Sequence, residues 1–351
     1  MLLVVGSVML KVRAHFYMAL CLLLAAATSG FAQNQIVGNP PAIQTASADN
    51  LIKFVGRFSG HTEAVNCVAF SPDGKTAFSG GDDDTIRLWD LHSFKQIRTF
   101  TEPFGAVHGI CVSPNGNLLI CAGYDHRMRI WNLTTGTQIS VFDCGCEAQT
   151  VAISPNGSWL AVGTFNGGVL WNLNTGREVA AFSHSDMGDY AFAWSPDGNY
   201  LALGGYEAQV RIWSISQQRF ILTFHPTGAQ IHALVFTPDG RYLICGTDQG
   251  DLVQCDATTG QQVRVFNSLD KLMYVTGVAV TPDGRELFSS EKDKTVRIWS
   301  LDTGQQIGVL REHNMDVLCV AVSSDGKYVL SGSADATAGL WQLPKSSTPV
   351  K

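Results

Sequence analysis

The densest group of side chains that could do chemistry lies in the stretch GDDDTIRLWD, residues 81–90, which contains Asp82, Asp83 and Asp84. Neighbouring carboxylates can hold a divalent cation or act as a general acid and base. A calcium loop that starts at Asp82 needs an acidic residue or Asn at 86 and Gly at 87, but the chain has Ile86 and Arg87. A phosphoaspartate motif of the form D-x-D-x-[TV] also fails at Ile86. The spacing therefore excludes both motifs.

Other chemical motifs are absent from the sequence. There is no G-x-S-x-G, G-x-G-x-x-G, P-loop or H-E-x-x-H pattern. Cys144 and Cys146 are close enough to suggest a disulfide or a metal ligand pair, but no second Cys or His pair lies at ligand spacing. We therefore expect no catalytic residue, no metal site and no cofactor.

A short turn motif recurs along the chain. Proline presets φ at the first corner of such a turn, Asp or Asn tolerates the second, and Gly supplies the positive φ that closes a hairpin. The successive motifs lie about 42 residues apart, at Pro72-Asp73-Gly74, Pro114-Asn115-Gly116, Pro155-Asn156-Gly157, Pro196-Asp197-Gly198, Pro238-Asp239-Gly240, Pro282-Asp283-Gly284 and Ser324-Asp325-Gly326.

Two further series keep the same period. One is a Trp series with a single exception, and it runs Trp89, Trp131, Trp171, Trp213, Cys255, Trp299 and Trp341. The other runs Phe58, Phe100, Phe142, Phe182, Phe224, Phe266 and Leu310. Alternating apolar segments between them predict four short strands in each unit, and a unit of 40 to 45 residues with four strands is typical of a propeller blade. The predicted repeats are about 58–100, 101–142, 143–182, 183–224, 225–266, 267–310 and 311–343 plus 51–58.

The ends of the repeats predict how the ring closes. The seventh unit stops after its Trp strand, and residues 51–58 carry Phe58 in the position of a last strand. The sequence thus predicts an all-β fold, a seven-bladed β-propeller of four-stranded antiparallel blades, closed by the N-terminal strand completing blade seven. Such closure removes open sheet edges.

These residues resemble the WD-repeat (Trp-Asp) β-propeller family over roughly 51–343. In that family His, Ser or Thr, Asp and Trp form a hydrogen-bonded network inside a blade. The resemblance implies this structural network in the first unit at His61, Ser79, Asp83 and Trp89, and in the seventh at His313, Ser331, Asp335 and Trp341. The other units lack at least one member, so we expect the middle blades to be less rigid at this position.

The N-terminal segment has the sequence features of an export signal. Lys11 and Arg13 precede an apolar run at residues 16–27, and small residues follow before Gln33. We predict a signal peptide at 1–32, a polar linker at 33–50 and a polar tail at 344–351. The expected location is periplasmic or secreted, in a bacterium, with a retained membrane anchor as the alternative. No membrane span is expected after cleavage, and buried free thiols are expected at Cys67, Cys111 and Cys319.

The position before the network Asp indicates where a partner would bind. The loops between second and third strands crowd around one end of a propeller channel. Tyr124, Phe165 and Tyr206 occupy adjacent units and would form an aromatic patch, which Phe104, Met187, Met273 and Tyr274 could extend. The alternative is that these rings pack against neighbouring loops. The predicted partner-binding residues are Asp82, Asp84, Tyr124, Phe165, Tyr206, Asp248, Lys292 and Tyr274.

Two functions are consistent with these features. The first is a non-catalytic scaffold, a monomeric propeller within a complex, that binds a protein or peptide at the channel end. The second is a small-ligand-binding or hydrolytic propeller, lactonase-like or metal-assisted, that uses Asp82, Asp84, Asp248 and Lys292. Nucleic acid is not an expected partner, because the formal net charge is −6 and no Lys/Arg cluster could neutralise phosphates.

Overall fold

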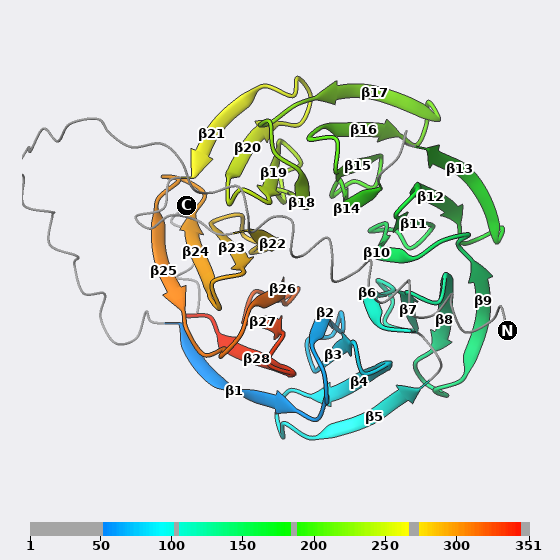
Figure 1. Cartoon of the computed structure of the whole chain (residues 1–351), viewed down its shortest axis with the longest axis vertical. Coiled ribbons are helices and arrows are strands. Elements are labelled where there is room, and N and C mark those ends of the chain that lie inside the picture. Colours follow the sequence, from blue (N-terminus) through cyan, green and yellow to red (C-terminus); the bar gives the residue numbers. More distant parts are fainter. Residues whose placement is uncertain (1–51, 102–104, 184–187, 267–273, 345–351) are drawn as a thin grey trace, which may run out of the picture. The chain divides into compact units, whose positions relative to one another are not determined.

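The protein is described by a computed structural model that covers residues 52–101, 105–183, 188–266 and 274–344. All of these residues belong to the compact unit Ala46–Lys351. The described residues form seven four-stranded sheets, each with antiparallel neighbours. Figure 1 shows the seven sheets arranged as blades in a ring, with the first strand of each blade at the centre. The predicted all-β, seven-bladed fold is confirmed.

The strands follow the repeat. Blades one to three comprise β2 (Val65–Phe70), β3 (Thr76–Gly81), β4 (Thr85–Asp90), β5 (Gln96–Thr101); β6 (Val107–Val112), β7 (Leu118–Gly123), β8 (Arg127–Asn132), β9 (Gln138–Asp143); and β10 (Ala148–Ile153), β11 (Trp159–Thr164), β12 (Gly167–Asn172), β13 (Arg177–Ser183). Blades four and five comprise β14 (Asp189–Trp194), β15 (Tyr200–Gly205), β16 (Val210–Ser214), β17 (Arg219–Phe224); and β18 (Ile231–Phe236), β19 (Tyr242–Thr247), β20 (Leu252–Asp256), β21 (Gln262–Phe266). Blades six and seven comprise β22 (Val275–Val280), β23 (Glu286–Glu291), β24 (Val296–Ser300), β25 (Gln306–Leu310); and β26 (Val317–Val322), β27 (Tyr328–Ser333), β28 (Thr337–Gln342), with β1 (Lys53–Ser59) as the outer strand of blade seven.

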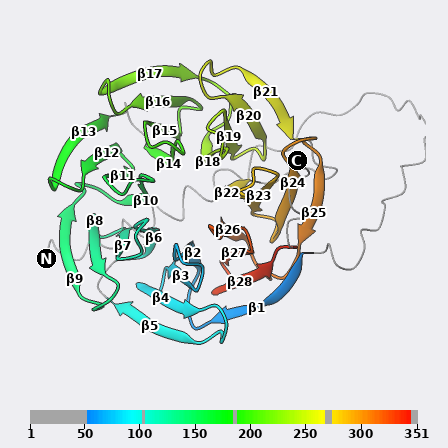
Figure 2. The ribbon, with the colours of Figure 1, turned by 180° about the vertical axis from the view of Figure 1, so that it is seen from behind.

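The ring closes through β1. This strand pairs antiparallel with β28, and its register places Phe54 opposite Trp341 and Phe58 opposite Ala338. Figure 2 shows the two strands, from opposite ends of the chain, side by side at the ring's edge. The predicted closure is therefore confirmed. The predicted signal peptide, the whole predicted linker and all but one residue of the predicted tail lie outside the described residues.

The aromatic series explains how blades pack on one another. The Phe of one outer strand contacts the Trp of the next blade's third strand, with ring centroids 5.3 Å apart for Phe58 and Trp89 and 4.9 Å apart for Phe182 and Trp213. Aromatic pairs at such distances contribute about 0.5–1.5 kcal/mol beyond the burial of their surface. The Phe series and the Trp series therefore share the same repeat length, because the Phe of one blade packs on the Trp of the next blade.

The recurring turn also joins neighbouring blades. Gly157 has φ +72°, and a Cβ built on it would lie 3.5 Å from Cδ of Pro114 in the preceding blade. Within each turn the acidic or amide side chain supports the backbone, as where Asp73 Oδ1 accepts hydrogen bonds from Ser71 Oγ at 2.6 Å and Lys75 N at 3.1 Å. The turns between first and second strands thus form one end of the propeller. The loops between second and third strands form the other end, because neighbouring strands are antiparallel.

Candidate partner-binding face

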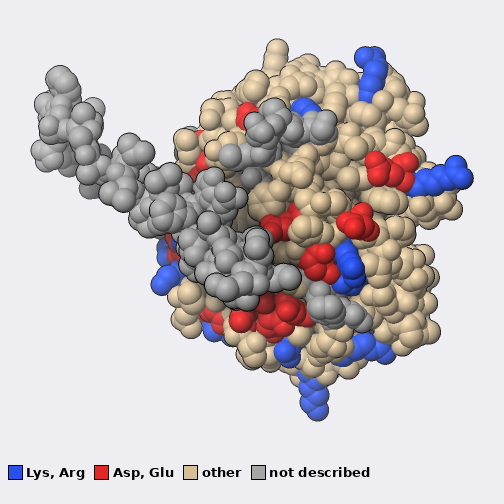
Figure 3. Space-filling view, turned by 45° about the vertical axis from the view of Figure 1, so that its right-hand side comes forward, with Lys and Arg blue, Asp and Glu red and all other residues tan. Residues whose placement is uncertain are grey.

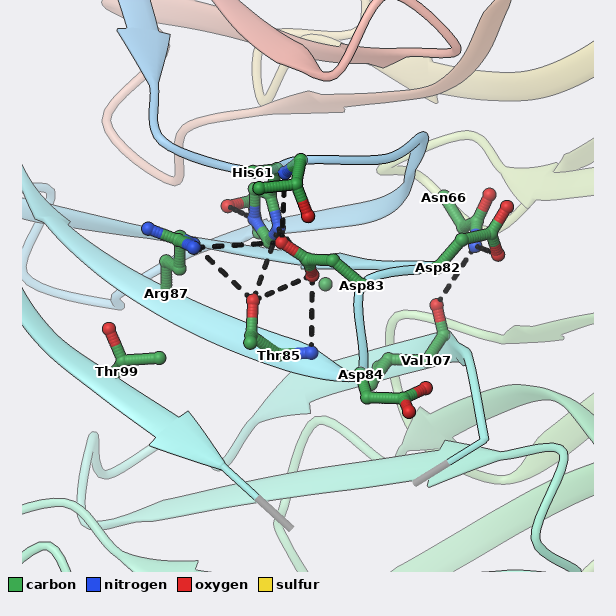
Figure 4. A network of polar contacts seen from close by, with 12 residues as sticks. His61, Asn66, Asp82, Asp83, Asp84, Thr85, Arg87, Thr99 and Val107 are labelled. Carbon is green, nitrogen blue, oxygen red and sulfur yellow. Dashed lines mark hydrogen bonds and ion pairs between the residues drawn. The ribbon is translucent and has the colours of Figure 1, made fainter. Parts of the chain in front are cut away.

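The acidic run Asp82–Asp84 lies at the end of the propeller that is formed by the loops between second and third strands. We call this end the loop face. Asp83 points into blade one, whereas Asp82 and Asp84 point toward blade two (Figure 4). Asp82 Oδ1 accepts a hydrogen bond from Asn66 Nδ2 at 2.6 Å and lies 3.8 Å from His108 Nε2. Asp84, at φ +58°, accepts a hydrogen bond from the Ala106 backbone N–H at 2.6 Å. Both flanking carboxylates therefore connect two blades.

Asp83 belongs to the polar network of blade one. It lies 2.9 Å from His61 Nδ1, while His61 Nε2 lies 2.7 Å from Ser79 Oγ. Trp89 Nε1 donates to the same Ser79 Oγ at 2.8 Å. Burial opposes the charge of Asp83, but the hydrogen bonds from His61 and Thr85 outweigh it, so the pKa of Asp83 is well below its usual value. The predicted hydrogen bonds of blade one are present.

Blade seven repeats the arrangement. His313 Nδ1 lies 3.0 Å from Asp335 Oδ2, and His313 Nε2 lies 2.7 Å from Ser331 Oγ. Trp341 is buried, with its ring centroid 5.9 Å from that of His313. Burial lowers the pKa of His313 despite the neighbouring Asp335 carboxylate. A neutral imidazole therefore connects a buried hydroxyl with a carboxylate, which satisfies polar groups in the blade interior.

Blade six fills the same space with an ion pair that the sequence did not lead us to expect. Glu291 is fully buried and accepts a hydrogen bond from Arg297 Nε at 2.9 Å, and Arg297 Nη2 donates to Asp293 at 2.7 Å. Ser289 Oγ donates to Glu291 at 3.0 Å and accepts from Trp299 Nε1 at 3.0 Å. Burial raises the pKa of Glu291 to about 7, although Arg297 opposes the rise. Blade six therefore has a buried polar network at this position although it lacks the His, and the expectation that the middle blades are less rigid there stays a prediction.

The predicted aromatic patch divides into two kinds of residue. Phe165 is 37% exposed and Tyr206 is 42% exposed, on the neighbouring blades three and four. Tyr124 is partly buried and stacks on His108, with ring centroids 4.2 Å apart and an interplanar angle of 11°. Tyr124 therefore packs against His108, as the alternative interpretation of the aromatic patch predicted. Phe104, Met187 and Met273 lie outside the described residues.

The remaining predicted residues lie on blades five and six. Lys292 Nζ is 4.0 Å from the centre of the Tyr274 ring, and Tyr274 Oη lies 2.7 Å from His232 Nε2. Burial, with a further contribution from the Lys292 charge, lowers the pKa of His232 to about 4. Asp248 accepts a hydrogen bond from Gln230 N at 3.2 Å, and burial raises its pKa. Asp248 and Lys292 therefore lie on blades five and six, away from Asp82 and Asp84 on blade one. Asp248 contacts Gln230, and Lys292 contacts Tyr274.

Sequence reasoning missed a polar position on the innermost strands. The second residue of the first strand is Asn66 in blade one, His108 in blade two and His232 in blade five. Each of these side chains contacts a predicted site residue: Asp82, Tyr124 and Tyr274, respectively. A polar residue at one fixed position of otherwise apolar strands was the available signal.

The loop face is acidic. Its described loops between second and third strands carry Asp82, Asp84, Glu207, Asp248 and Asp251, against Lys292 and Lys294. The other carboxylates of these loops, Asp83, Asp125, Asp293 and Asp335, pair with His61, Arg129, Arg297 and His313. Figure 3 shows Asp and Glu in the middle and lower part of the visible surface, while most Lys and Arg project from its edge. Charge of one sign at a surface favours partners of the opposite sign and speeds their association.

Three other observations bear on possible chemistry. Within the described ranges, no three or more His, Cys, Asp or Glu side chains are grouped so that they could hold a metal ion. Cys144 and Cys146 are free thiols. Cys67, Cys111 and Cys319 are also free thiols, but only Cys67 is buried, whereas Cys111 and Cys319 are partly exposed. No helix long and apolar enough to cross a membrane occurs in the part of the chain that the structure covers.

Comparison with protein families gives two matches. The family described as "IFT122 first beta-propeller" matches residues 47–272, which is more than half of the chain. The family described as "WD domain, G-beta repeat" matches residues 260–300 and 304–342. Together the two matches cover all the described strands, from β1 to β28.

Similar curated proteins come from eukaryotes. The chain is 28% identical to small ribosomal subunit protein RACK1y of Oryza sativa over 167 residues, 45% of this chain and 49% of that protein. It is 25% identical to a chromatin assembly factor 1 subunit of Gallus gallus over 153 residues, 43% of this chain and 24% of that protein. It is 63% identical to the Notchless protein homolog of Arabidopsis thaliana over 35 residues, 10% of this chain and 7% of that protein. The chain thus spans about half or less of each of these relatives.

Proposed function

The chain belongs to the WD40-repeat β-propeller family, and from that premise we propose that it is a non-catalytic scaffold whose loop face binds a protein or peptide. The observation that carries the proposal is the exposure of Phe165 and Tyr206 on adjacent blades of an acidic face. Exposed aromatic side chains are typical anchors of protein interfaces. Two relatives support it, since their names describe a component of a chromatin assembly factor and a ribosomal subunit protein.

The chemistry of this face favours one kind of partner segment. An apolar side chain would contact the two rings, and flanking Lys or Arg would face the carboxylates. Binding to such a segment should weaken as salt concentration rises, because exposed charges are screened. A hydrolytic role has less support, since Asp82 and Asp84 hold blade two while Asp248 and Lys292 lie on other blades.

The test is recovery of a partner with the purified protein. Phe165→Ala combined with Tyr206→Ala should reduce partner recovery at least tenfold without lowering the melting temperature. Tyr200→Ala is the matched control, because Tyr200 is 38% exposed on blade four but begins β15, at the opposite end of that blade from Tyr206. Equal recovery by the double variant and the control would count against this face as the binding site.

We also propose that the protein is exported and works as a monomeric propeller within a complex, in the periplasm or outside the cell. The proposal rests on the basic and apolar N-terminal residues, and the eukaryotic relatives leave the bacterial origin a prediction. Sequencing the N-terminus of the protein from the exported fraction tests it, with Gln33 as the expected first residue. An intact N-terminus on protein recovered only with the cells would refute cleavage and export.

A further inference from the structure

A hollow of about 430 Å³ lies between blades five and six. Its walls come from the turns β18–β19, β22–β23 and β24–β25, which lie at the end of the propeller opposite the loop face. The hollow is lined by Thr237, Pro238, Asp239, Tyr242, Gln254, Asp283, Gly284, Leu301 and Asp302. It shares no residue with the proposed partner-binding site.

Gln254 sets this hollow apart. The side chain is only 5% exposed, and among the described residues its Oε1 has no hydrogen-bond partner. A buried acceptor without a partner is unfavourable, so such groups are rare in folded proteins. The position before the Trp or Cys of the third strand is apolar in the other six blades, where it is Leu88, Ile130, Leu170, Ile212, Ile298 and Leu340.

The repeat supplies an internal comparison. An equivalent hollow of about 540 Å³ lies between blades one and two, where Leu88 takes the place of Gln254. Its wall contains Ser71, Pro72 and Asp73 at the positions of Thr237, Pro238 and Asp239 in the hollow between blades five and six. The shape and the turn chemistry therefore belong to the repeat, whereas the buried amide belongs to blade five alone.

The charges around the hollow are balanced. Arg264 donates to the backbone oxygens of Leu301 at 2.6 Å and Asp302 at 3.0 Å. Arg285 Nε lies 3.9 Å from Asp283, and the guanidinium of Arg241 lies 5.0 Å from the centre of the Tyr242 ring. Three arginines thus offset the three carboxylates that line the hollow, Asp239, Asp283 and Asp302. The distinguishing feature is an uncharged amide, not a charge.

We propose that this hollow binds an amide group of a peptide, either a backbone amide or the side chain of Asn or Gln. An amide offers both an N–H donor and a carbonyl acceptor, so it complements the Gln254 amide. Oε1 itself is covered by the surrounding protein, so the Gln254 side chain would turn toward the hollow when the amide binds. The N–H of the amide would then supply the missing partner of Oε1, and its carbon atoms would contact Pro238, Leu301 and the Tyr242 ring. This would be a second peptide contact, independent of Phe165 and Tyr206.

The test uses small amides and full-length protein labelled with ¹⁵N-glutamine. The Gln254 side-chain resonances are identified by their absence in Gln254→Leu. Titration with N-methylacetamide, which imitates the backbone, and with propanamide, which imitates an Asn or Gln side chain, should shift them progressively. Methyl acetate has nearly the shape of N-methylacetamide but no N–H, so it should bind at least tenfold more weakly. Comparison of the two amides distinguishes backbone from side-chain recognition.

Two variants complete the design. Gln254→Leu should abolish amide binding yet raise the melting temperature, because it removes the unpartnered acceptor, and it should leave partner recovery at the loop face unchanged. Leu88→Gln should create amide binding between blades one and two. Equal shifts with amides and ester would overturn the proposal, as would a tightly held water on Gln254 Oε1 that amides do not displace.

Discussion

Arg297→Met should destabilise the protein by an amount that depends on pH. Arg297 is 2% exposed and is the cation that faces the fully buried Glu291 carboxylate at 2.9 Å. Removing one member of a buried ion pair usually lowers the free energy of unfolding by about 3–5 kcal/mol, because the other charge is left without compensation. Glu291 can avoid that penalty by binding a proton, so the loss in free energy of unfolding should depend on pH.

The magnitude follows from the pKa of Glu291. Burial already raises this pKa from 4.5 to about 7 in the presence of Arg297. A carboxyl whose pKa is raised by folding contributes stability that is complete below the unfolded pKa and is lost as pH rises through the folded value. Without Arg297 the folded pKa rises further, so above pH 7 the variant keeps losing stability while the wild type has levelled off. The difference between them should grow by about 1.4 kcal/mol per pH unit there.

Urea denaturation at pH 6, 7 and 8 measures this difference. Arg129→Met is the matched control, because Arg129 is also buried and pairs with Asp125, but Gly123 stands where blade six has Glu291. The control should lose stability by a similar amount at all three pH values. If Arg297→Met costs the same at pH 6 as at pH 8, Glu291 does not take up the proton and the reasoning fails.

Three further substitutions, one of them with a control, test the ring closure and the blade-one network. Phe58→Ala should cost about 3–5 kcal/mol in urea denaturation because Phe58 is buried between blades, whereas Val55→Ala on the same strand, with Val55 38% exposed, should cost little. Ser79→Ala should lower the free energy of unfolding by about 2–4 kcal/mol, because His61 and Trp89 both lose their buried partner. Asp83→Asn should flatten the acid side of the stability profile, because the lowered pKa of Asp83 adds stability above pH 3.8 that is lost on acidification.

The fold was predictable because its determinants are local and repeated. A turn of the Pro-Asp-Gly type, with Asn or Ser as variants, fixes a hairpin wherever it occurs, and seven such turns in one frame fix the number of blades. Phe58 before the first complete unit was enough to predict the closure, because its only equivalent positions are last strands. The His61 and His313 networks were predictable for the same reason, since each residue occupies a fixed place in the frame.

The loop face was less predictable because its contacts cross from blade to blade. The sequence predicted Asp82 and Asp84 as partner-binding residues, yet they accept hydrogen bonds from Asn66 and from the Ala106 backbone. Tyr124 and Phe165 occupy equivalent positions, but Tyr124 is partly buried and stacks on His108, whereas Phe165 is 37% exposed. Equivalent positions have different surroundings, and a one-dimensional pattern does not contain the neighbouring blade.

The two His networks lie next to the point where the ring closes. They lie in blades seven and one, the two blades that β1 connects, since β1 pairs with β28 and leads directly to His61. Closing the ring brings together strands almost 300 residues apart, which costs more chain entropy than forming any other blade. We expect the hydrogen-bonded networks on both sides of that junction to offset part of this cost. Blade five, which lies away from this junction, holds Gln254 and Cys255 where each of the other six blades holds an apolar residue followed by Trp.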